Sequence, residues 1–445
     1  SQQELTRADT LRGSITPERA WWDVMHYDLK VKVNPSEKTI TGSNTILYKV
    51  LNENDVMQID LQSPMKIDKV LEDGKEIEFT SEGNAHFLKL QKKQKQGKEN
   101  KITIHFSGKP RVAVRPPWDG GFTWSKDSNG KHFIATSNQG IGSSVWWPLK
   151  DHPSEEADNG VTIAVTTPKD LMDISNGRLR KMIENKDSKT WIWEVSNPIN
   201  SYGVNINIGD YVHFGEQYKG EKGMLDMDYY VLRENEAKAK DQFKQAPLMM
   251  EAFEHWFGPY PFYEDGFKLV EVPYLGMEHQ SSVTYGNKYV NGYLGGDVSG
   301  SGWGLKFDFI IIHESGHEWF ANNITNKDVA DMWVHEGFTS YSENIYLDYH
   351  FGKQASSEYV IGVRKNIANK TPIIGGQYNV NKSGSGDMYY KGANVLHTVR
   401  QLIADDEKWR QILRGLNKEF YHQNVTSKQI ENYISSKSGI DLSVF

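Results

Sequence analysis

The segment FIIIHESGHEWF, at residues 309–320, has two histidines four positions apart in an apolar stretch, His313 and His317. Side chains at positions i and i+4 lie on one face of a helix, about 5–6 Å apart. This spacing lets both imidazoles bind one tetrahedral zinc ion. Glu314 stands beside the pair, where a carboxylate can accept a proton from a water molecule at the metal. The segment predicts a zinc-binding helix; two satisfied core histidines are the alternative interpretation of this pattern on its own.

Glu336 is a third candidate ligand, in the segment ADMWVHEGFTSYSEN at residues 330–344. We expect it on a second helix, nineteen positions after His317. A site of two histidines and one carboxylate leaves a fourth position open for water, which is typical of catalytic zinc sites. We therefore predict one Zn2+ ion bound by His313, His317 and Glu336, with Glu314 as the general base.

A second carboxylate follows on the same predicted helix. Glu343 lies seven residues after Glu336, and therefore on the same helix face. It resembles a carboxylate that orients a ligand histidine through a hydrogen bond. A solvated surface charge is the alternative interpretation of Glu343.

Composition and charge exclude several classes of protein. The chain has 445 residues, a net charge of −7, 38% hydrophobic residues and no cysteine. This composition rules out a disordered chain, a disulfide scaffold and thiolate metal sites. The negative charge argues against nucleic acid as a partner, and we interpret the one dense basic run, at residues 91–98, as a solvated hairpin tip. No apolar run approaches the roughly 18 residues that a transmembrane segment needs.

The first residue gives weak information about location. The chain begins at Ser1 without a methionine, so we expect that a leader was removed or that the chain was trimmed. On this ground we favour a periplasmic or secreted protein, and an intracellular one stays open.

The pattern of apolar residues changes along the chain. Up to about residue 206, short alternating segments separated by turn residues predict strands packed as a saddle or sandwich. Longer helical patterns follow, so we predict a multidomain α+β protein with a β-rich N-terminal domain (1–208) and an α-rich domain (209–445). The clearest predicted strands are 27–33, 45–50, 101–106 and 161–167, and the clearest predicted helices are 235–257, 305–323, 328–351 and 387–404.

Four segments together resemble a known family. HESGH with WVHEGF resembles the gluzincin metallopeptidases, and YLGMEHQ (274–280) resembles the Gly-x-Met-Glu-Asn motif of the aminopeptidase N-like group. That group includes the leukotriene A hydrolase-like enzymes. YYKGANVLHTV (389–399) resembles its Tyr-x-Lys-Gly segment, which assigns Tyr389 as the catalytic tyrosine. SNQGIGSSVWWPLKDHPS (137–154) resembles an N-terminal-domain segment whose glutamine, here Gln139, reaches the active site.

The resemblance implies a zinc aminopeptidase with a thermolysin-like catalytic domain. Glu278 would pair with the free α-ammonium of a peptide substrate, and Gln139 would accept a hydrogen bond from the same amine. The backbone at Gly276 would pair with the substrate as an added strand, and Met277 would shape the pocket beside it. Tyr389 would stabilise the oxyanion together with zinc. The expected partners are peptides with a free N-terminus.

The chain departs from the family pattern at three places. His279 replaces the usual asparagine after Glu278, which could change the amine pocket or add a group that titrates near pH 6–7. His335 precedes the ligand Glu336; we expect it to be structural, with competition for the metal as the alternative. The chain stops at GIDLSVF (439–445), where the family continues into a further helix and a C-terminal domain.

Three other functions remain as alternatives on the same site. An epoxide hydrolase of the leukotriene A hydrolase type would use an additional aspartate, and Asn381 stands at that position by ungapped count, which weighs against this activity. An endopeptidase would use the same metal without an amine requirement. A non-catalytic peptide-binding member would have lost the base or a ligand, and all of them are present here.

Overall fold

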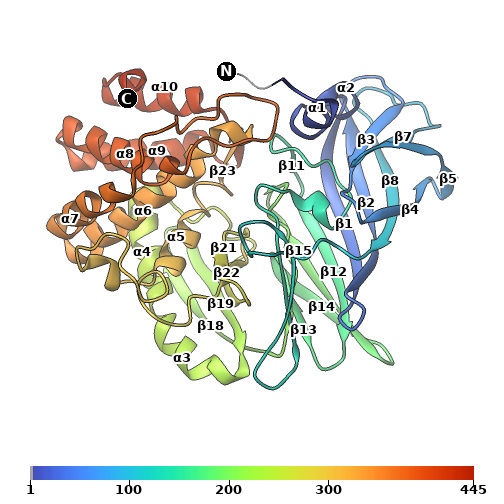
Figure 1. Cartoon of the computed structure of the whole chain (residues 1–445), viewed down its shortest axis with the longest axis horizontal. Helices are drawn as coiled ribbons and strands as arrows, with labels where there is room; N and C mark the ends of the chain where they lie inside the picture. The colour runs from blue at the N-terminus through green and yellow to red at the C-terminus, as the bar shows by residue number, and fades with distance from the viewer. Residues whose placement is uncertain (1–3) are drawn as a thin grey trace.

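The computed structural model describes residues 4–445. A β-rich domain, blue to green in Figure 1, lies beside a second domain, yellow-green to red, whose helices cover a smaller sheet. This is the multidomain α+β arrangement that the sequence predicts. None of the helices within the described residues combines the length and the apolar character needed to cross a bilayer.

An eight-stranded sheet is the frame of the N-terminal domain. Its four clearest strands were predicted from alternation, because β1 buries Leu29, Val31 and Val33 on one face and exposes the residues between them. β1 pairs antiparallel with β2 and parallel with β12. The sheet has the order β14 (Arg178–Glu184), β15 (Ser188–Val195), β12 (Val161–Pro168), β1 (Trp22–Asn34), β2 (Thr39–Val50), β8 (Glu99–Gly108), β4 (Lys66–Glu72) and β5 (Lys75–Ile77).

A four-stranded sheet of the same domain leads toward the second domain. β10 pairs antiparallel with β9, and Gly121 at the start of β9 faces Ser137 at the end of β10. The Tyr274 hydroxyl of the second domain donates a hydrogen bond to the carbonyl of Thr136 at 2.7 Å. The sheet has the order β13 (Met172–Ile174), β17 (Asn207–Gly209), β10 (His132–Ser137) and β9 (Gly121–Lys126). The domain's remaining strands are β3 (Val56–Asp60), β6 (Phe79–Glu82), β7 (Ala85–Lys89), β11 (Glu156–Ala157) and β16 (Ile199–Asn200).

The second domain opens with a hairpin rather than with a helix. β18 and β19 extend the strand-rich part of the chain to Leu232, and the helices of this domain begin at Glu236, within the helix predicted for 235–257. β19, β20 and β22 are parallel neighbours, and the short strand β21 pairs antiparallel with β22 at the sheet edge. The sheet has the order β18 (Tyr211–Gly220), β19 (Gly223–Leu232), β20 (Phe267–Glu271), β22 (Val283–Tyr285) and β21 (Gly276–Met277), and β23 (Ile324–Asn326) pairs with β24 (Gln423–Val425).

The predicted helix at 305–323 is much shorter in the structure. It begins after Asp308, whose side chain accepts hydrogen bonds from the amides of Ile310 and Ile311. It ends near His317, because the chain must turn for Ile324 to pair with Gln423. The helices are α1 (Arg7–Gly13), α2 (Thr16–Ala20), α3 (Glu236–Gln242), α4 (Gln245–Phe257), α5 (Phe309–Gly316), α6 (Trp333–Phe351), α7 (Lys353–Val363), α8 (Tyr390–Ile403), α9 (Asp406–Glu419) and α10 (Ser427–Ser438).

The two domains meet through buried polar contacts. The Asn176 side chain donates to the carbonyl of Gln280 at 2.7 Å, and the Asn200 side chain donates to Asn322 Oδ1 at 3.0 Å. These bonds satisfy groups that would be costly to bury alone. The predicted boundary after residue 208 falls within β17, and it stays a prediction.

Replacing Arg19 tests a buried ion pair that anchors α2 to β3. Arg19 Nη2 lies 2.8 Å from Asp60 Oδ1, and both side chains are buried. Arg19→Ala should lower the free energy of unfolding by about 3–5 kcal/mol, because Asp60 stays buried without its cation. Arg7→Ala is the control and should cost under about 1 kcal/mol, because the Arg7–Glu82 pair is exposed. Urea unfolding followed by circular dichroism measures both changes, and equal losses would contradict the prediction.

Candidate functional site

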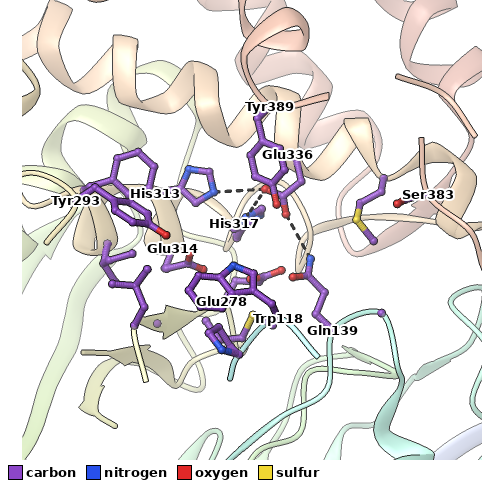
Figure 2. Close-up of a pocket in the computed structure, with 18 of the residues that line it drawn as sticks. Trp118, Gln139, Glu278, Tyr293, His313, Glu314, His317, Glu336, Ser383 and Tyr389 are labelled. Carbon is purple, nitrogen blue, oxygen red and sulfur yellow. Dashed lines mark hydrogen bonds and ion pairs between the residues drawn. The ribbon is translucent and has the colours of Figure 1, made fainter. Parts of the chain in front are cut away.

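Helices α5 and α6 bring the three predicted metal ligands together. The imidazole rings of His313 and His317 lie 5.0 Å apart, centroid to centroid. Glu336 Oε2 lies 3.3 Å from His313 Nε2 and 3.2 Å from His317 Nε2. Figure 2 shows the three side chains converging on one side of a cavity. All three residues are buried, so this convergence is sheltered from bulk water.

The second nitrogen of each imidazole is already occupied. His313 Nδ1 donates to Glu343 Oε2 at 2.8 Å, and Glu343 also accepts from the Tyr359 hydroxyl at 2.5 Å. His317 Nδ1 donates to the backbone carbonyl of Phe320 at 2.9 Å. Both Nε2 atoms are therefore directed at the cavity. Glu336 Oε2 is buried there and, within the described residues, has no conventional hydrogen-bond donor. Two imidazole nitrogens and one carboxylate oxygen are a donor set that fits zinc.

The site has more negative than positive charge. Burial, and next the carboxylate of Glu278, raise the pKa of Glu314 to about 8. Burial alone would lower the pKa of His317, but the carboxylates of Glu336 and Glu278 outweigh it and raise that pKa to about 9. Ligand atoms of Glu278, Glu314 and His317 lie within 4.8 Å of one another. Carboxylates this close together favour a positively charged group between them.

The remaining predicted residues line the same cavity, which has a volume of about 540 Å3. The Tyr389 ring lies at 6.1 Å from the His313 ring, centroid to centroid, in a stacked orientation. Gln139 comes from the N-terminal domain, and its Nε2 donates to Glu336 Oε1 at 3.3 Å. Gly276 and Met277 form β21, so the edge strand of the sheet borders the cavity.

Two residues that hold Glu278 were missed by sequence reasoning. The Tyr202 hydroxyl donates to Glu278 Oε1 at 3.3 Å, and the Asn322 side chain donates to the Glu278 carbonyl at 2.8 Å. Tyr202 follows β16 in the N-terminal domain and belongs to no local motif. Trp118, from the same domain, lines the cavity and was also missed. A polar or aromatic residue in a loop carries no periodic signal, so its approach to the site depends on how the domains meet.

His279 and His335, the two histidines that depart from the family pattern, both have partners within the fold. His279 is buried with Nδ1 at 3.4 Å from Thr284 Oγ1, and burial lowers its pKa to about 3. Of the two alternatives for His279, this burial contradicts the group that titrates near pH 6–7, and the changed amine pocket stays a prediction. His335 Nε2 accepts a hydrogen bond from the Asn326 amide at 2.8 Å, which agrees with a structural role. Asn381 stands where an epoxide hydrolase of the leukotriene A hydrolase type would have an aspartate. Its side chain donates a hydrogen bond to the Gly140 carbonyl at 3.0 Å.

Several known proteins are similar in sequence to this chain over most of its length. Leukotriene A-4 hydrolase of Xenopus laevis is 23% identical, over 96% of this chain and 70% of its own length. Aminopeptidase N of Lactobacillus helveticus is 24% identical, over 94% of this chain and 49% of its own length. Tricorn protease-interacting factor F2 of Thermoplasma volcanium is 25% identical, over 72% of this chain and 40% of its own length. The chain thus spans less than half the length of two of these three relatives.

A solved structure shares the fold. The M1 zinc metallopeptidase of Deinococcus radiodurans matches with a TM-score of 0.80 at 20% identity, over 96% of this chain and 94% of that chain. Two family descriptions match the sequence: the peptidase M1 N-terminal domain over residues 24–202, and the peptidase family M1 domain over residues 242–445. Because the β-rich domain and the helical domain each match their counterpart in the same order, this chain belongs to the M1 peptidase family of zinc metallopeptidases.

Proposed function

We propose that the protein is a zinc-dependent aminopeptidase that removes the N-terminal residue from peptides. The observation that carries this proposal is the buried carboxylate of Glu278, in the same cavity as the two-histidine, one-carboxylate cluster. The hydrolysis itself needs only two carboxylates in the cavity, the base Glu314 and the ligand Glu336, so Glu278 is a third. A carboxylate beside the cluster is explained by a substrate that brings a positive charge with it. The names of the aminopeptidase relatives agree with this proposal.

His313, His317 and Glu336 would bind one Zn2+ ion. When bound, zinc lowers the pKa of a coordinated water to about 7 and polarises the peptide carbonyl. Glu343 would keep His313 in the tautomer and orientation that leave Nε2 available, through the 2.8 Å hydrogen bond at Nδ1. We also propose that residues 209–445 form the catalytic domain and residues 1–208 a β-rich domain that completes the site.

Glu314 would accept a proton from the attacking water and later deliver it to the leaving amine. Its Oε2 is buried and, among the described residues, has no hydrogen-bond partner, so it is available to the substrate and the water. A general base works best when its pKa lies near the operating pH, and burial together with Glu278 raises the pKa of Glu314 to about 8. A cation at the neighbouring ligands would favour the ionised form, which is the form that accepts a proton.

Tyr389 would donate a hydrogen bond to the oxyanion that forms at the substrate carbonyl. Burial, followed by the carboxylates of Glu336, Glu278 and Glu314, raises its pKa well above the ordinary value. The hydroxyl therefore stays protonated across the working range and remains a donor. A donor aimed at developing negative charge in a buried site is typically worth about 3–4 kcal/mol.

Glu278 would select peptides with a free N-terminus. Tyr202 and Asn322 hold it in place, and its charge would pair with the substrate ammonium. A substrate without that ammonium would leave Glu278 buried and unpaired, which is costly. Gly276 and Met277 lie on an edge strand, whose free backbone groups could pair with the substrate as an added strand.

Hydrolysis of free and N-acetylated aminoacyl amides tests the proposed function. The zinc-loaded protein should cleave the free amines and leave the acetylated twins intact, because acetylation removes the charge that Glu278 pairs with. Glu278→Gln should lower kcat/KM for the free amines by about 30-fold or more, as expected when one partner of a buried charge pair is removed. Equal cleavage of acetylated substrates would make the protein an endopeptidase and refute this role of Glu278.

Two further variants separate the general base from the oxyanion donor. Glu314→Gln should lower kcat by about 10²–10⁴-fold, because the proton acceptor is lost. Tyr389→Phe should lower kcat by about 10²–10³-fold with little change in KM, because its hydrogen bond forms only in the transition state. Zinc content, measured by atomic absorption, should be unchanged in both. Full activity of either zinc-loaded variant would refute the corresponding role.

Glu343→Gln tests the support of the metal ligand. Loss of the carboxylate should weaken zinc affinity by about 10–100-fold, because His313 is less firmly oriented and less basic. Glu419→Gln, on the exposed surface of α9, is the matched control and should leave the affinity unchanged. Competition with a chromogenic chelator measures both. An unchanged affinity in Glu343→Gln would show that the Glu343 contact has no bearing on the metal.

A further inference from the structure

We propose that Trp118 determines substrate specificity, with its indole ring forming the wall against which the first side chain of the peptide packs. This inference rests on the proposed aminopeptidase function. Trp118 lines the cavity together with Glu278, Glu314 and Tyr389. In Figure 2 its side chain lies among these labelled residues. It therefore brings an aromatic surface from the N-terminal domain to a site whose charged groups all come from the other domain.

The strand pairing explains how Trp118 reaches the site. Gly121, which begins β9, faces Ser137, which ends β10. Residues just before β9 and just after β10 must therefore lie at the same end of this hairpin. Trp118 precedes β9 and Gln139 follows β10, and both line the cavity. The two residues are presented to the site by one end of one hairpin.

The loop that carries Trp118 is held by its own polar contacts. The Asp119 carboxylate accepts hydrogen bonds from the amides of Val114 and Arg115, at 2.6 and 2.8 Å, and from the Arg111 side chain at 3.0 Å. Gly120 packs so closely that a Cβ atom there would lie 2.4 Å from Ile141 Cγ2. These contacts of Asp119 and Gly120 hold the loop, and none of them involves the indole ring.

Among the described residues, the indole ring of Trp118 makes no hydrogen bond and no aromatic contact. Trp118 is 67% exposed, although large aromatic side chains are usually well buried. Because the loop is anchored by Asp119, the ring is free to serve a ligand. Tyr293 and Phe309 also line this cavity, so an apolar side chain entering it would meet aromatic surface from both domains.

The position of the substrate amine decides which side chain meets Trp118. The first side chain of a peptide branches from the carbon that also bears the ammonium. Once Glu278 pairs with that ammonium, the first side chain must lie within a few bonds of it, inside the cavity that Trp118 also lines. Packing of a large apolar side chain against an indole ring removes both surfaces from water. We therefore expect a preference for large apolar first residues.

Replacing the ring tests this inference in the zinc-loaded protein. Trp118→Ala should lower kcat/KM by about 10–100-fold for leucyl and phenylalanyl amides, and by less than about 3-fold for the alanyl amide, which buries little surface. Trp118→Phe should recover most of the lost activity. Val114→Ala is the matched control, because Val114 lies on the same loop, is 80% exposed and does not line the cavity. It should leave every rate unchanged.

Each outcome has a separate meaning. A fall in the ratio of leucyl to alanyl cleavage in Trp118→Ala, with Trp118→Phe near the wild type, supports the inference. Equal losses on all amides would indicate that Trp118 supports the loop, and unchanged rates would indicate that substrate does not contact it; either result overturns the inference while the aminopeptidase proposal stands. Failure of the wild type to cleave any free aminoacyl amide would overturn the proposed function instead, and this inference with it.

Discussion

A surplus of buried negative charge is the constraint on which the site depends. Glu278, Glu314, Glu336 and Glu343 are all buried around two histidines. An uncompensated buried carboxylate costs several kcal/mol, so each of these groups is either protonated or stabilised by a positive partner. Under the proposed function, the zinc ion and the substrate ammonium would be those partners. Because the metal would bind the folded cluster and not the unfolded chain, its affinity would contribute directly to folding stability.

The two domains contribute different chemistry to the cavity. The helical domain supplies the charged groups, from α5, α6 and the segment after β21. The N-terminal domain supplies neutral groups: the amide of Gln139, the hydroxyl of Tyr202 and the indole of Trp118. Neutral donors can hold a carboxylate without cancelling its charge, which leaves Glu278 available for an ammonium. The β-rich domain is therefore a part of the proposed recognition site and not only a support for it.

Features set by residues close together in the sequence could be predicted, and features set by distant segments could not. The pair His313 and His317 was predictable because its geometry is set within one helix turn, and Glu343 because it follows Glu336 at a helical interval. Tyr202 and Trp118 were not predictable, because their approach to the site depends on how two domains dock. The helix at 305–323 was predicted too long, since the pairing of Ile324 with a distant strand ends it early. The pattern of apolar residues indicates local periodicity only. The positions of Tyr202 and Trp118 and the end of this helix depend on tertiary contacts.

Close packing of β21 against α5 fixes the distance between the proposed amine site at Glu278 and the proposed metal site. A Cβ atom at Gly276 would lie 2.5 Å from Ile310 Cγ2 and 2.9 Å from the Thr284 carbonyl, so β21 lies directly against α5. β21 leads into Glu278, and α5 carries His313 and Glu314 and ends directly before His317. The separation between the proposed amine site and the proposed metal is therefore set by backbone packing rather than by flexible side chains. A fixed separation allows one length of substrate between the bound amine and the attacked carbonyl. If the proposal is correct, cleavage after the first residue is a consequence of the glycine that lets this strand and helix touch.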